Sequence, residues 1–347
     1  MTALAPRQDG PGTETVPGPR RRLVGLVVAL VVLVVLLVLS VMIGSTAIAP
    51  SVVWDALFHS STGIDRFAIR DFRLPRTIVG LVVGVALGLS GALIQALTRN
   101  PLADPGVLGV HAGASFAVTV AVGLLGVRDA QGYMWFAFAG TLIVTLLVLA
   151  LGSTRQGSSP VVVVLAGVCA GAVLGGAREA LQLTNPDAFD AMRYWNAGSI
   201  VGRPIEVVWP ILPFFAVALI LALAVSGPLN ALALGDELAV AQGVRLVRTR
   251  VLAVIALTLL AGGATAIAGP IGFVGLMVPH VARWIVGPHQ RWIFAYSILL
   301  APSLLLVSDI LGRVVMRPGE IPVGIVTAFV GAPVLVALVR RKKASGL

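Results

Sequence analysis

The chain has very few of the side chains that usually carry out chemistry. It contains one cysteine, Cys169, and four histidines among 347 residues, so an intrachain disulfide or a thiolate metal cluster is excluded. The only lysines are Lys342 and Lys343, which rules out a GxxxxGK[ST] phosphate-binding loop. Histidines and carboxylates show no HExxH or paired-carboxylate spacing. We therefore expect no catalysis, no metal site and no cofactor bound by this chain.

Charged residues are also scarce, and apolar ones replace them. Hydrophobic residues make up 58% of the chain and charged residues 12%, with a mean hydropathy of +0.99. No soluble fold could bury this much apolar surface, so the composition predicts a polytopic membrane protein. A net charge of +10 would suggest a nucleic-acid partner in a soluble protein. In a membrane protein the positive-inside rule explains it, and no nucleic acid is expected.

Hydropathy predicts an all-α protein with about ten transmembrane helices. The predicted spans are residues 23–44, 74–97, 107–126, 133–152, 160–182, 205–226, 248–268, 270–286, 292–311 and 321–340.

These spans divide the chain into one transmembrane domain and two tails. Residues 1–22 are expected to be a disordered cytoplasmic tail, residues 23–340 the transmembrane domain, and residues 341–347 a basic cytoplasmic tail. The first span ends near small residues, as a signal peptide does. Its apolar run exceeds the usual signal core of about 7–15 residues, so a retained helix is the favoured interpretation.

The charges between the spans predict the orientation. An even number of spans places both termini on one side. With the termini in the cytoplasm, the inner face holds 15 of the 25 basic residues and five acids, a net +10, whereas the outer face holds ten bases and ten acids. The whole net charge is then explained by topology, and both termini are predicted to be cytoplasmic.

Two spans have unusual features. Glycines at 80, 84, 88 and 91 place small residues on one face of the second span, which favours close packing against a neighbouring helix. The span at 270–286 is short and contains Pro270 and Pro279. Because proline removes backbone donors, we expect a broken helix there, buried against neighbours that satisfy the freed carbonyls.

Buried charges of the kind that ion-coupled carriers use are rare. Asp309 and Arg178 are the nearest candidates, and both lie toward the outer ends of their spans. Interfacial charges stabilised by water and by each other are favoured over a proton relay. Energy is therefore expected to come from a partner.

The cytoplasmic segment at 228–248 is the place where such a partner could act. Gly235 breaks the chain, Asp236 and Glu237 suit the first turn of a helix, and Gly243 ends that helix. The pattern predicts a short helical elbow at the membrane surface. It is either an amphipathic connection or a docking knob for a nucleotide-binding subunit.

Several long motifs occur in an order that identifies a family. RLPRTIVG, GALIQALTRNPLADPGVLGV, ALGDELAVAQG, GPIGFVGLMVPHVARWIVG and DILGRVV resemble the iron-chelate and vitamin B12 (FecCD/BtuC-type) permeases of ATP-binding cassette (ABC) importers, from about residue 51 to residue 343. TRNPLADPGVLGV and NPDAFDAMRYWNAGS are most similar to ferric enterobactin permease subunits.

The resemblance implies an assembly and a set of contacts. It implies two permease subunits around one pathway, two ATPase subunits that use ATP, and an extracytoplasmic binding protein that delivers a ferric siderophore. Arg73, Arg76 and Arg313 match the arginines that receive acids of the binding protein, and the predicted topology also places them outside. Snorkelling to lipid headgroups is the alternative role for any one of them.

Other positions are matched to roles with less detail. The residues that match the family's ATPase-coupling segment are Gly235, Asp236, Glu237, Ala239 and Gly243. Gln95, Ser158 and Ser159 are candidates for the translocation pathway, although an interhelical hydrogen bond is the favoured role of Gln95. His111 fits a capping or interfacial role, and the sequence assigns no role to His280.

The expected function is therefore that of a permease subunit in the bacterial plasma membrane. The resemblance to ferric enterobactin permeases implies a heterodimer with a related chain, and a homodimer is the alternative. A secondary transporter, a structural or sensory membrane protein, and a permease for another iron chelate, haem or vitamin B12 are the alternative functions.

Overall fold

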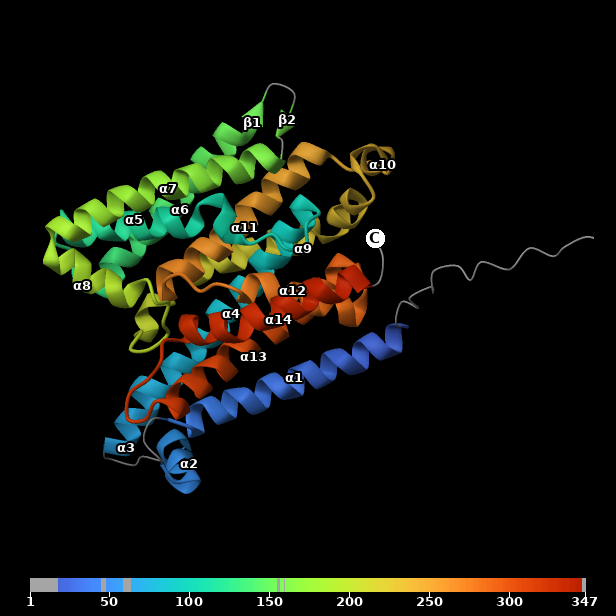
Figure 1. Cartoon of the computed structure of the whole chain (residues 1–347). Helices are drawn as coiled ribbons and strands as arrows, with labels where there is room; N and C mark the ends of the chain where they lie inside the picture. Colours follow the sequence, from blue (N-terminus) through green and yellow to red (C-terminus); the bar gives the residue numbers. More distant parts are fainter. Residues whose placement is uncertain (1–17, 45–47, 59–63, 155–156, 159, 345–347) are drawn as a thin grey trace, which may run out of the picture.

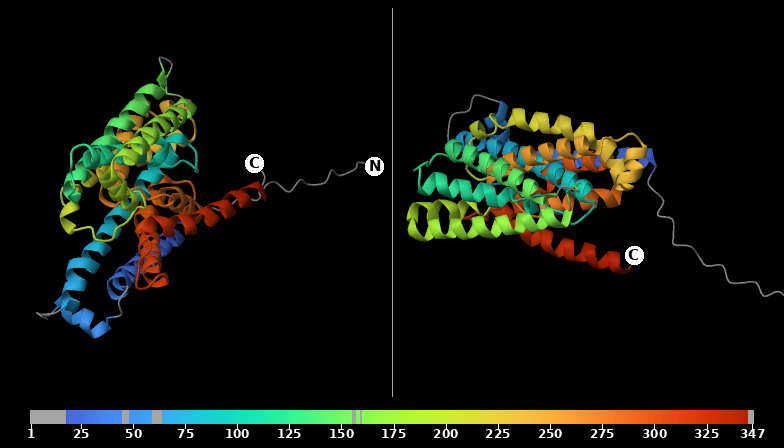
Figure 2. Two further views of the ribbon diagram at one scale, coloured as in Figure 1. Left: turned by 60° about the vertical axis from the view of Figure 1, so that its left-hand side comes forward. Right: turned by 90° about the horizontal axis from the view of Figure 1, so that it is seen from above.

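The computed structural model describes residues 18–44, 48–58, 64–154, 157–158 and 160–344. Over these residues the chain is a bundle of helices that run roughly side by side, with one hairpin of two-residue strands (Figures 1 and 2). The all-α prediction is confirmed. The structure also agrees with the ten predicted spans. Seven described helices are long and apolar enough to cross a membrane, and three more are apolar but shorter.

These ten helices form the body of the bundle. They are α1 (Pro19–Met42), α4 (Leu74–Thr98), α5 (Val110–Gly123), α6 (Ala130–Gly152), α7 (Pro160–Thr184), α9 (Leu212–Ala233), α11 (Leu246–Ala268), α12 (Val274–Val286), α13 (Gln290–Val315) and α14 (Val323–Ala344).

Shorter elements connect the helices at the two ends of the bundle. At one end lie α2 (Pro50–Phe58), α3 (Ile64–Phe67) and α8 (Pro186–Trp195), and at the other lie α10 (Asp236–Ala241) and the hairpin of β1 (Ser153–Thr154) and β2 (Gly157–Ser158) (Figure 1). The start of α1 and the end of α14 lie at the α10 end. The remaining short elements are a π-helix, η1 (Ala68–Arg73), and two 3-10 turns, η2 (Pro105–Leu108) and η3 (Ile205–Val207).

Three predicted boundaries are wrong. The span predicted at 205–226 begins at Leu212 and continues through Pro228 to Ala233, because residues 205–207 form a 3-10 turn and Pro213 occupies the first turn of α9. Residues 19–22 are helical, since Pro19 starts α1. At the other terminus α14 continues to Ala344, into the predicted tail. Residues 1–17 lie outside the described residues.

The glycine face of α4 packs as predicted. Glycine there allows the backbones to approach, because a Cβ at Gly84 would overlap Pro302 of α13 and one at Gly88 would overlap Ser297 and Ala301. A Cβ at Gly91 would overlap the carbonyl oxygen of Gly275 in α12. Helix α4 is therefore the central helix of the bundle. In its most apolar stretch, 78% of the residues are buried inside the chain.

Helix α12 is the broken span that the prolines predicted. It has 13 residues, about 20 Å at 1.5 Å per residue, which is too short to cross the apolar core. Pro279 cannot donate to the carbonyl of Gly275, four residues earlier. Gln95 Nε2 of α4 donates instead to Gly275 O at 3.4 Å and to Leu276 O at 2.9 Å. A neighbouring helix therefore supplies the donor that proline removes.

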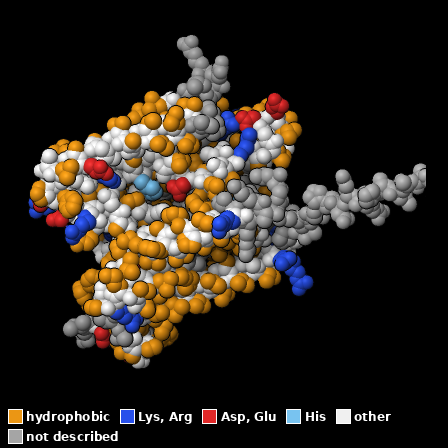
Figure 3. Space-filling view, in the orientation of Figure 1, with side chains coloured by type: hydrophobic (Ala, Val, Ile, Leu, Met, Phe, Trp, Pro, Cys, Tyr) orange, Lys and Arg blue, Asp and Glu red, His pale blue; other side chains and the backbone are white. Residues whose placement is uncertain are grey.

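The surface of the bundle is mostly apolar. Figure 3 shows hydrophobic side chains over most of the visible face, with charged side chains mainly toward its edges. Large exposed residues cover one side of α1, among them Leu23, Val27 and Val31. This distribution is that of a multi-pass membrane protein, with lipid or another subunit covering the apolar faces.

The contact between Gly91 and Gly275 leads to a stability prediction. We expect Gly91→Ala to lower the stability of the protein by about 1–3 kcal/mol, because the added methyl group forces α4 and α12 apart. Gly176→Ala in α7 is the matched control, since nothing lies within 4 Å of a Cβ there. Thermal unfolding in detergent measures both, and equal melting temperatures for the two variants would contradict the prediction.

Candidate functional sites at the two ends of the bundle

A buried cluster of charges joins three helices at the end of the bundle that carries α2 and α3. Arg76 of α4 donates to both carboxylate oxygens of Asp309 in α13, with Nε at 3.0 Å from each and Nη2 at 2.6 Å from Oδ1. Its Nη1 donates to Glu320 Oε2 at 2.5 Å. Arg313, one turn after Asp309, donates from Nε to Oδ2 at 2.9 Å. One carboxylate therefore holds two guanidinium groups.

Arg313 and two further arginines donate to carbonyls at the C-terminal end of α1. Arg313 Nη1 donates to the carbonyls of Ser40 and Ile43 at 2.7 and 2.8 Å, and Arg73 Nη1 donates to Met42 O at 2.8 Å. Arg317 Nη2 donates to Gly44 O at 3.1 Å. The last carbonyls of a helix lack intrahelical donors and carry partial negative charge, so arginine is a favourable cap there. We call Arg73, Arg76, Arg313 and Arg317 with Asp309 and Glu320 the outer arginine cluster.

The three arginines that were matched to docking are largely buried in this chain. Arg73 and Arg76 are each 7% exposed and Arg313 is 1% exposed. The physical reason is that their main acceptors are internal: a carboxylate of α13 and backbone carbonyls of α1. Docking of a binding protein on these side chains stays a prediction.

Asp309 also differs from its expected surroundings. It is fully buried rather than interfacial, and it pairs with Arg76 and Arg313 rather than with Arg178. Arg178 lies 3.4 Å from Glu179 on its own helix, α7. The spacing of Asp309 and Arg313, four residues apart on one helix, was a signal in the sequence for their pairing.

The opposite end carries the predicted elbow, helix α10. Gly235 precedes it with a φ of 116°, Asp236 and Glu237 occupy its first turn, and Gly243 follows it with a φ of 80°. Both glycines adopt backbone conformations that side chains disfavour. Ala239 is fully buried against Ala231 and Leu232 at the end of α9, whereas Leu238 and Val240 are more than half exposed. The predicted short helix is confirmed, and its contact with an ATPase stays a prediction.

Asp236 holds two arginines that the sequence did not single out. Its Oδ1 accepts from Arg99, which follows α4, and its Oδ2 accepts from Arg250 Nη2 of α11 at 2.6 Å. Hydrogen bonds from Arg250 and then Arg99 hold the pKa of Asp236 below its ordinary value. The carboxylate therefore stays ionised at neutral pH. In the sequence, the separations of 137 and 14 residues gave no sign of these pairs.

Of the three pathway candidates, the structure describes the side chain of Gln95 alone. Gln95 is 2% exposed and donates to α12, which is the interhelical hydrogen bond that the favoured prediction expects. A place for Gln95 on the pathway stays a prediction. Ser158 lies in β2, but its side chain and all of Ser159 lie outside the described residues. Both serines stay predictions.

The histidines lie in separate places. His111 Nδ1 is 3.2 Å from Thr265 Oγ1, which links α5 to α11, and His280 lies edge-on to Trp284. Within the described part of the chain, no group of three His, Cys, Asp or Glu residues could hold a metal ion.

The buried carboxylate of the outer arginine cluster leads to a second prediction. Asp309→Asn keeps the size of the side chain but leaves Arg76 and Arg313 without their shared charge, so we expect a loss of about 3–5 kcal/mol in stability. Glu320→Gln is the matched control, because this side chain is 24% exposed and its pair is worth about 1 kcal/mol or less. Thermal unfolding compares the two, and an equal loss from both would refute the special role of Asp309.

Known proteins are similar to this chain over most of its length. The ferric enterobactin transport system permease protein FepD of Escherichia coli (strain K12) is 48% identical over 88% of this chain and 92% of its own length. The Fe(3+)-citrate import system permease protein YfmD of Bacillus subtilis (strain 168) is 37% identical over 92% of this chain and 95% of its own.

A solved structure and a family match extend the comparison to the fold. A metal-chelate type ABC transporter in an inward-facing conformation superposes with a TM-score of 0.79 at 27% identity, covering 92% of this chain and 99% of that one. Residues 32–341 match the FecCD transport family, which is nearly all of the bundle. The chain belongs to the FecCD transport family.

Proposed function

We propose that the chain is the permease subunit of an ABC importer that carries a ferric siderophore of the enterobactin type across the bacterial cytoplasmic membrane. The observation that carries this proposal is the 48% identity to a ferric enterobactin permease over nearly the whole of both chains. The fold supports it, since the bundle matches a metal-chelate type ABC transporter along its length.

The energy for transport comes from partner ATPase subunits in this proposal. This chain binds no cofactor, and ATP is bound and hydrolysed by the partner. Helix α10 with its flanking Gly235 and Gly243 is the proposed contact, because Leu238 and Val240 stand exposed at the end of the bundle where α1 starts and α14 ends. Exposed apolar side chains on a short surface helix suit insertion into a groove of another protein.

The opposite end is the proposed landing place of the binding protein. The outer arginine cluster combines four arginines with two acids. Such a cluster attracts carboxylates of an approaching protein even where its guanidinium groups are buried. Arg73, Arg76 and Arg313 therefore act by shaping and charging this end.

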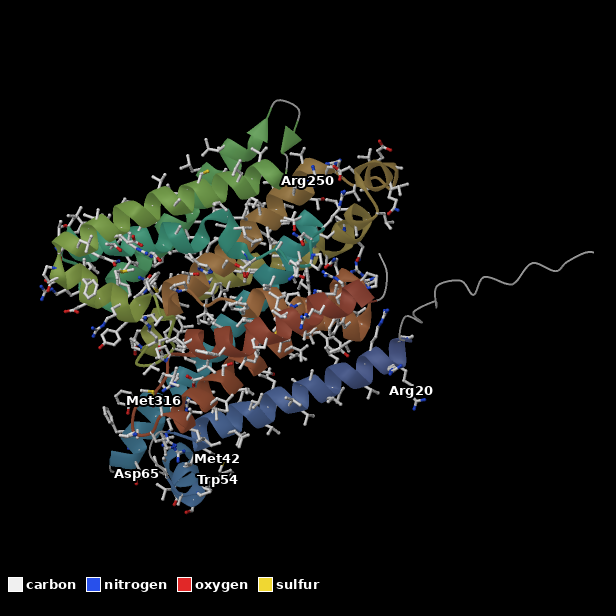
Figure 4. All side chains as sticks on the ribbon, in the orientation of Figure 1. Arg20, Met42, Trp54, Asp65, Arg250 and Met316 are labelled. Atoms are coloured by element: carbon white, nitrogen blue, oxygen red, sulfur yellow. The ribbon has the colours of Figure 1, made fainter. Side chains whose placement is uncertain are left out.

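The orientation and the second permease half complete the proposal. Figure 4 shows Met42, Trp54, Asp65 and Met316 at one end of the molecule and Arg20 and Arg250 at the other. We place the second end, with both termini, in the cytoplasm, in accordance with the positive-inside rule. The partner permease is a related chain in a heterodimer.

Uptake of labelled iron tests the function and the substrate class. A deletion strain should lose uptake of iron supplied as a catecholate siderophore, and the complemented strain should recover it, with hydroxamate and citrate complexes as controls. Loss of the partner ATPase should abolish uptake, whereas collapse of the ion gradient alone should not. The reverse result would favour a secondary transporter.

The glycine after α10 tests the proposed ATPase contact. We expect Gly243→Trp to lose substrate-stimulated ATP hydrolysis, because a bulky side chain at this exposed turn keeps α10 from its partner. Gly243→Asn is the control, since asparagine tolerates the left-handed backbone and is small. Substrate-stimulated hydrolysis at the parental level in the tryptophan variant would contradict the contact.

A further inference from the structure

Asp236 lies where three separate parts of the chain meet. It is the first residue of α10, and its carboxylate accepts from Arg99 at the C-terminal end of α4 and from Arg250 in the second turn of α11. All three side chains are about 40% exposed, at 42%, 40% and 38%. This triad therefore joins the surface helix α10 to two transmembrane helices.

Helix α10 has little else that fixes it to the bundle. It has six residues, and its buried residue is Ala239. This side chain packs with Ala231 and Leu232 of α9, and Val244 and Leu246 pack against the same cluster. Glu237, Leu238 and Val240 face outward and are exposed. A helix of this length is not stable alone, so its position depends on tertiary contacts. An apolar contact fixes α10 against α9, while the two ion pairs determine where its first turn lies relative to α4 and α11.

Helix α4 is suited to carry a displacement from one end of the bundle to the other. It has 25 residues, about 37 Å at 1.5 Å per residue, without an internal break. Arg76 in its first turn holds Asp309 and Glu320, and Arg99 directly after its last turn holds Asp236. Between them the glycine face packs α4 tightly against α12 and α13. A movement of α10 that pulls on Arg99 therefore also displaces α4, whose first turn belongs to the outer arginine cluster.

We propose that Asp236 is a positioning residue of transport: its ion pairs with Arg99 and Arg250 transmit the movement of α10 to α4 and α11. The proposal rests on the proposed ABC permease function and adds to it the route by which work at α10 reaches the bundle. The carboxylate remains charged at neutral pH, so the link persists throughout the transport cycle unless it is pulled apart.

A distance measurement on the full chain in lipid nanodiscs tests the link without any partner. Spin labels at Leu102→Cys, after α4, and Leu238→Cys, on α10, can be introduced on a Cys169→Ala background, and both positions are exposed. Asp236→Asn should broaden the distance distribution. Arg248→Gln, which removes an exposed arginine two residues from Arg250, should leave it unchanged. An unchanged distribution in Asp236→Asn, or equal broadening in both variants, would overturn the proposal.

Transport by the reconstituted complex tests the consequence. The variant complex should contain as many ATPase subunits per permease as the parental complex. Asp236→Asn should then lower the amount of substrate transported per ATP hydrolysed by about 2- to 10-fold, the factor expected from the loss of two partly exposed ion pairs. Adding Arg99→Gln should cause little further loss, because the pair is already broken. Arg291→Gln, an exposed cytoplasmic arginine on α13, is the charge control.

The two failures are distinguishable. Parental transport per ATP in Asp236→Asn, or a loss explained by fewer bound ATPase subunits, would refute the transmission role while leaving the permease function standing. Failure of the parental complex to couple ATP hydrolysis to uptake would refute the proposed function, and the distance measurement would still decide whether the triad fixes α10.

Discussion

A single carboxylate, that of Asp309, is the constraint on which the outer end of the bundle depends. The guanidinium groups of Arg76 and Arg313 bind it where it is fully buried, and Arg313 together with Arg73 also donates to carbonyls at the end of α1. A charge placed there without partners would be costly, as would uncapped carbonyls in an apolar setting. The cluster removes both costs together, and in doing so it fixes α1 and α4 to α13.

The helices were predictable because the bilayer makes simple demands. Every span must be apolar and must satisfy its own backbone, so hydropathy located all ten of the main helices. Prolines predicted the break at α12 for the same reason. The error at α9 arose because Pro204 and Pro210 delay the helix while apolar residues continue, so hydropathy alone began the span too early.

The two sites differed in how much of them could be predicted, because their determinants differ in range. Helix α10 depends on local features, namely two glycines and two acids within nine residues, and it was predicted closely. The burial of Arg73 and Arg313 depends on backbone carbonyls about 30 and 270 residues away. Backbone acceptors have no residue identity, so sequence patterns could not identify these partners.

The proposed cargo explains why so few polar residues suffice between the two ends. Iron held by a siderophore needs no protein ligands, so the chain has only to open and close a passage of adequate width. Such a chain depends mainly on contacts that hold its helices together. Three polar side chains make such contacts along α4: Asp309 at one end, Asp236 at the other and Gln95 between them. In each case a polar group of one helix replaces what another helix lacks, whether a countercharge or a donor. Fixed contacts of this kind tie neighbouring helices together, which favours displacement of whole helices over local rearrangement.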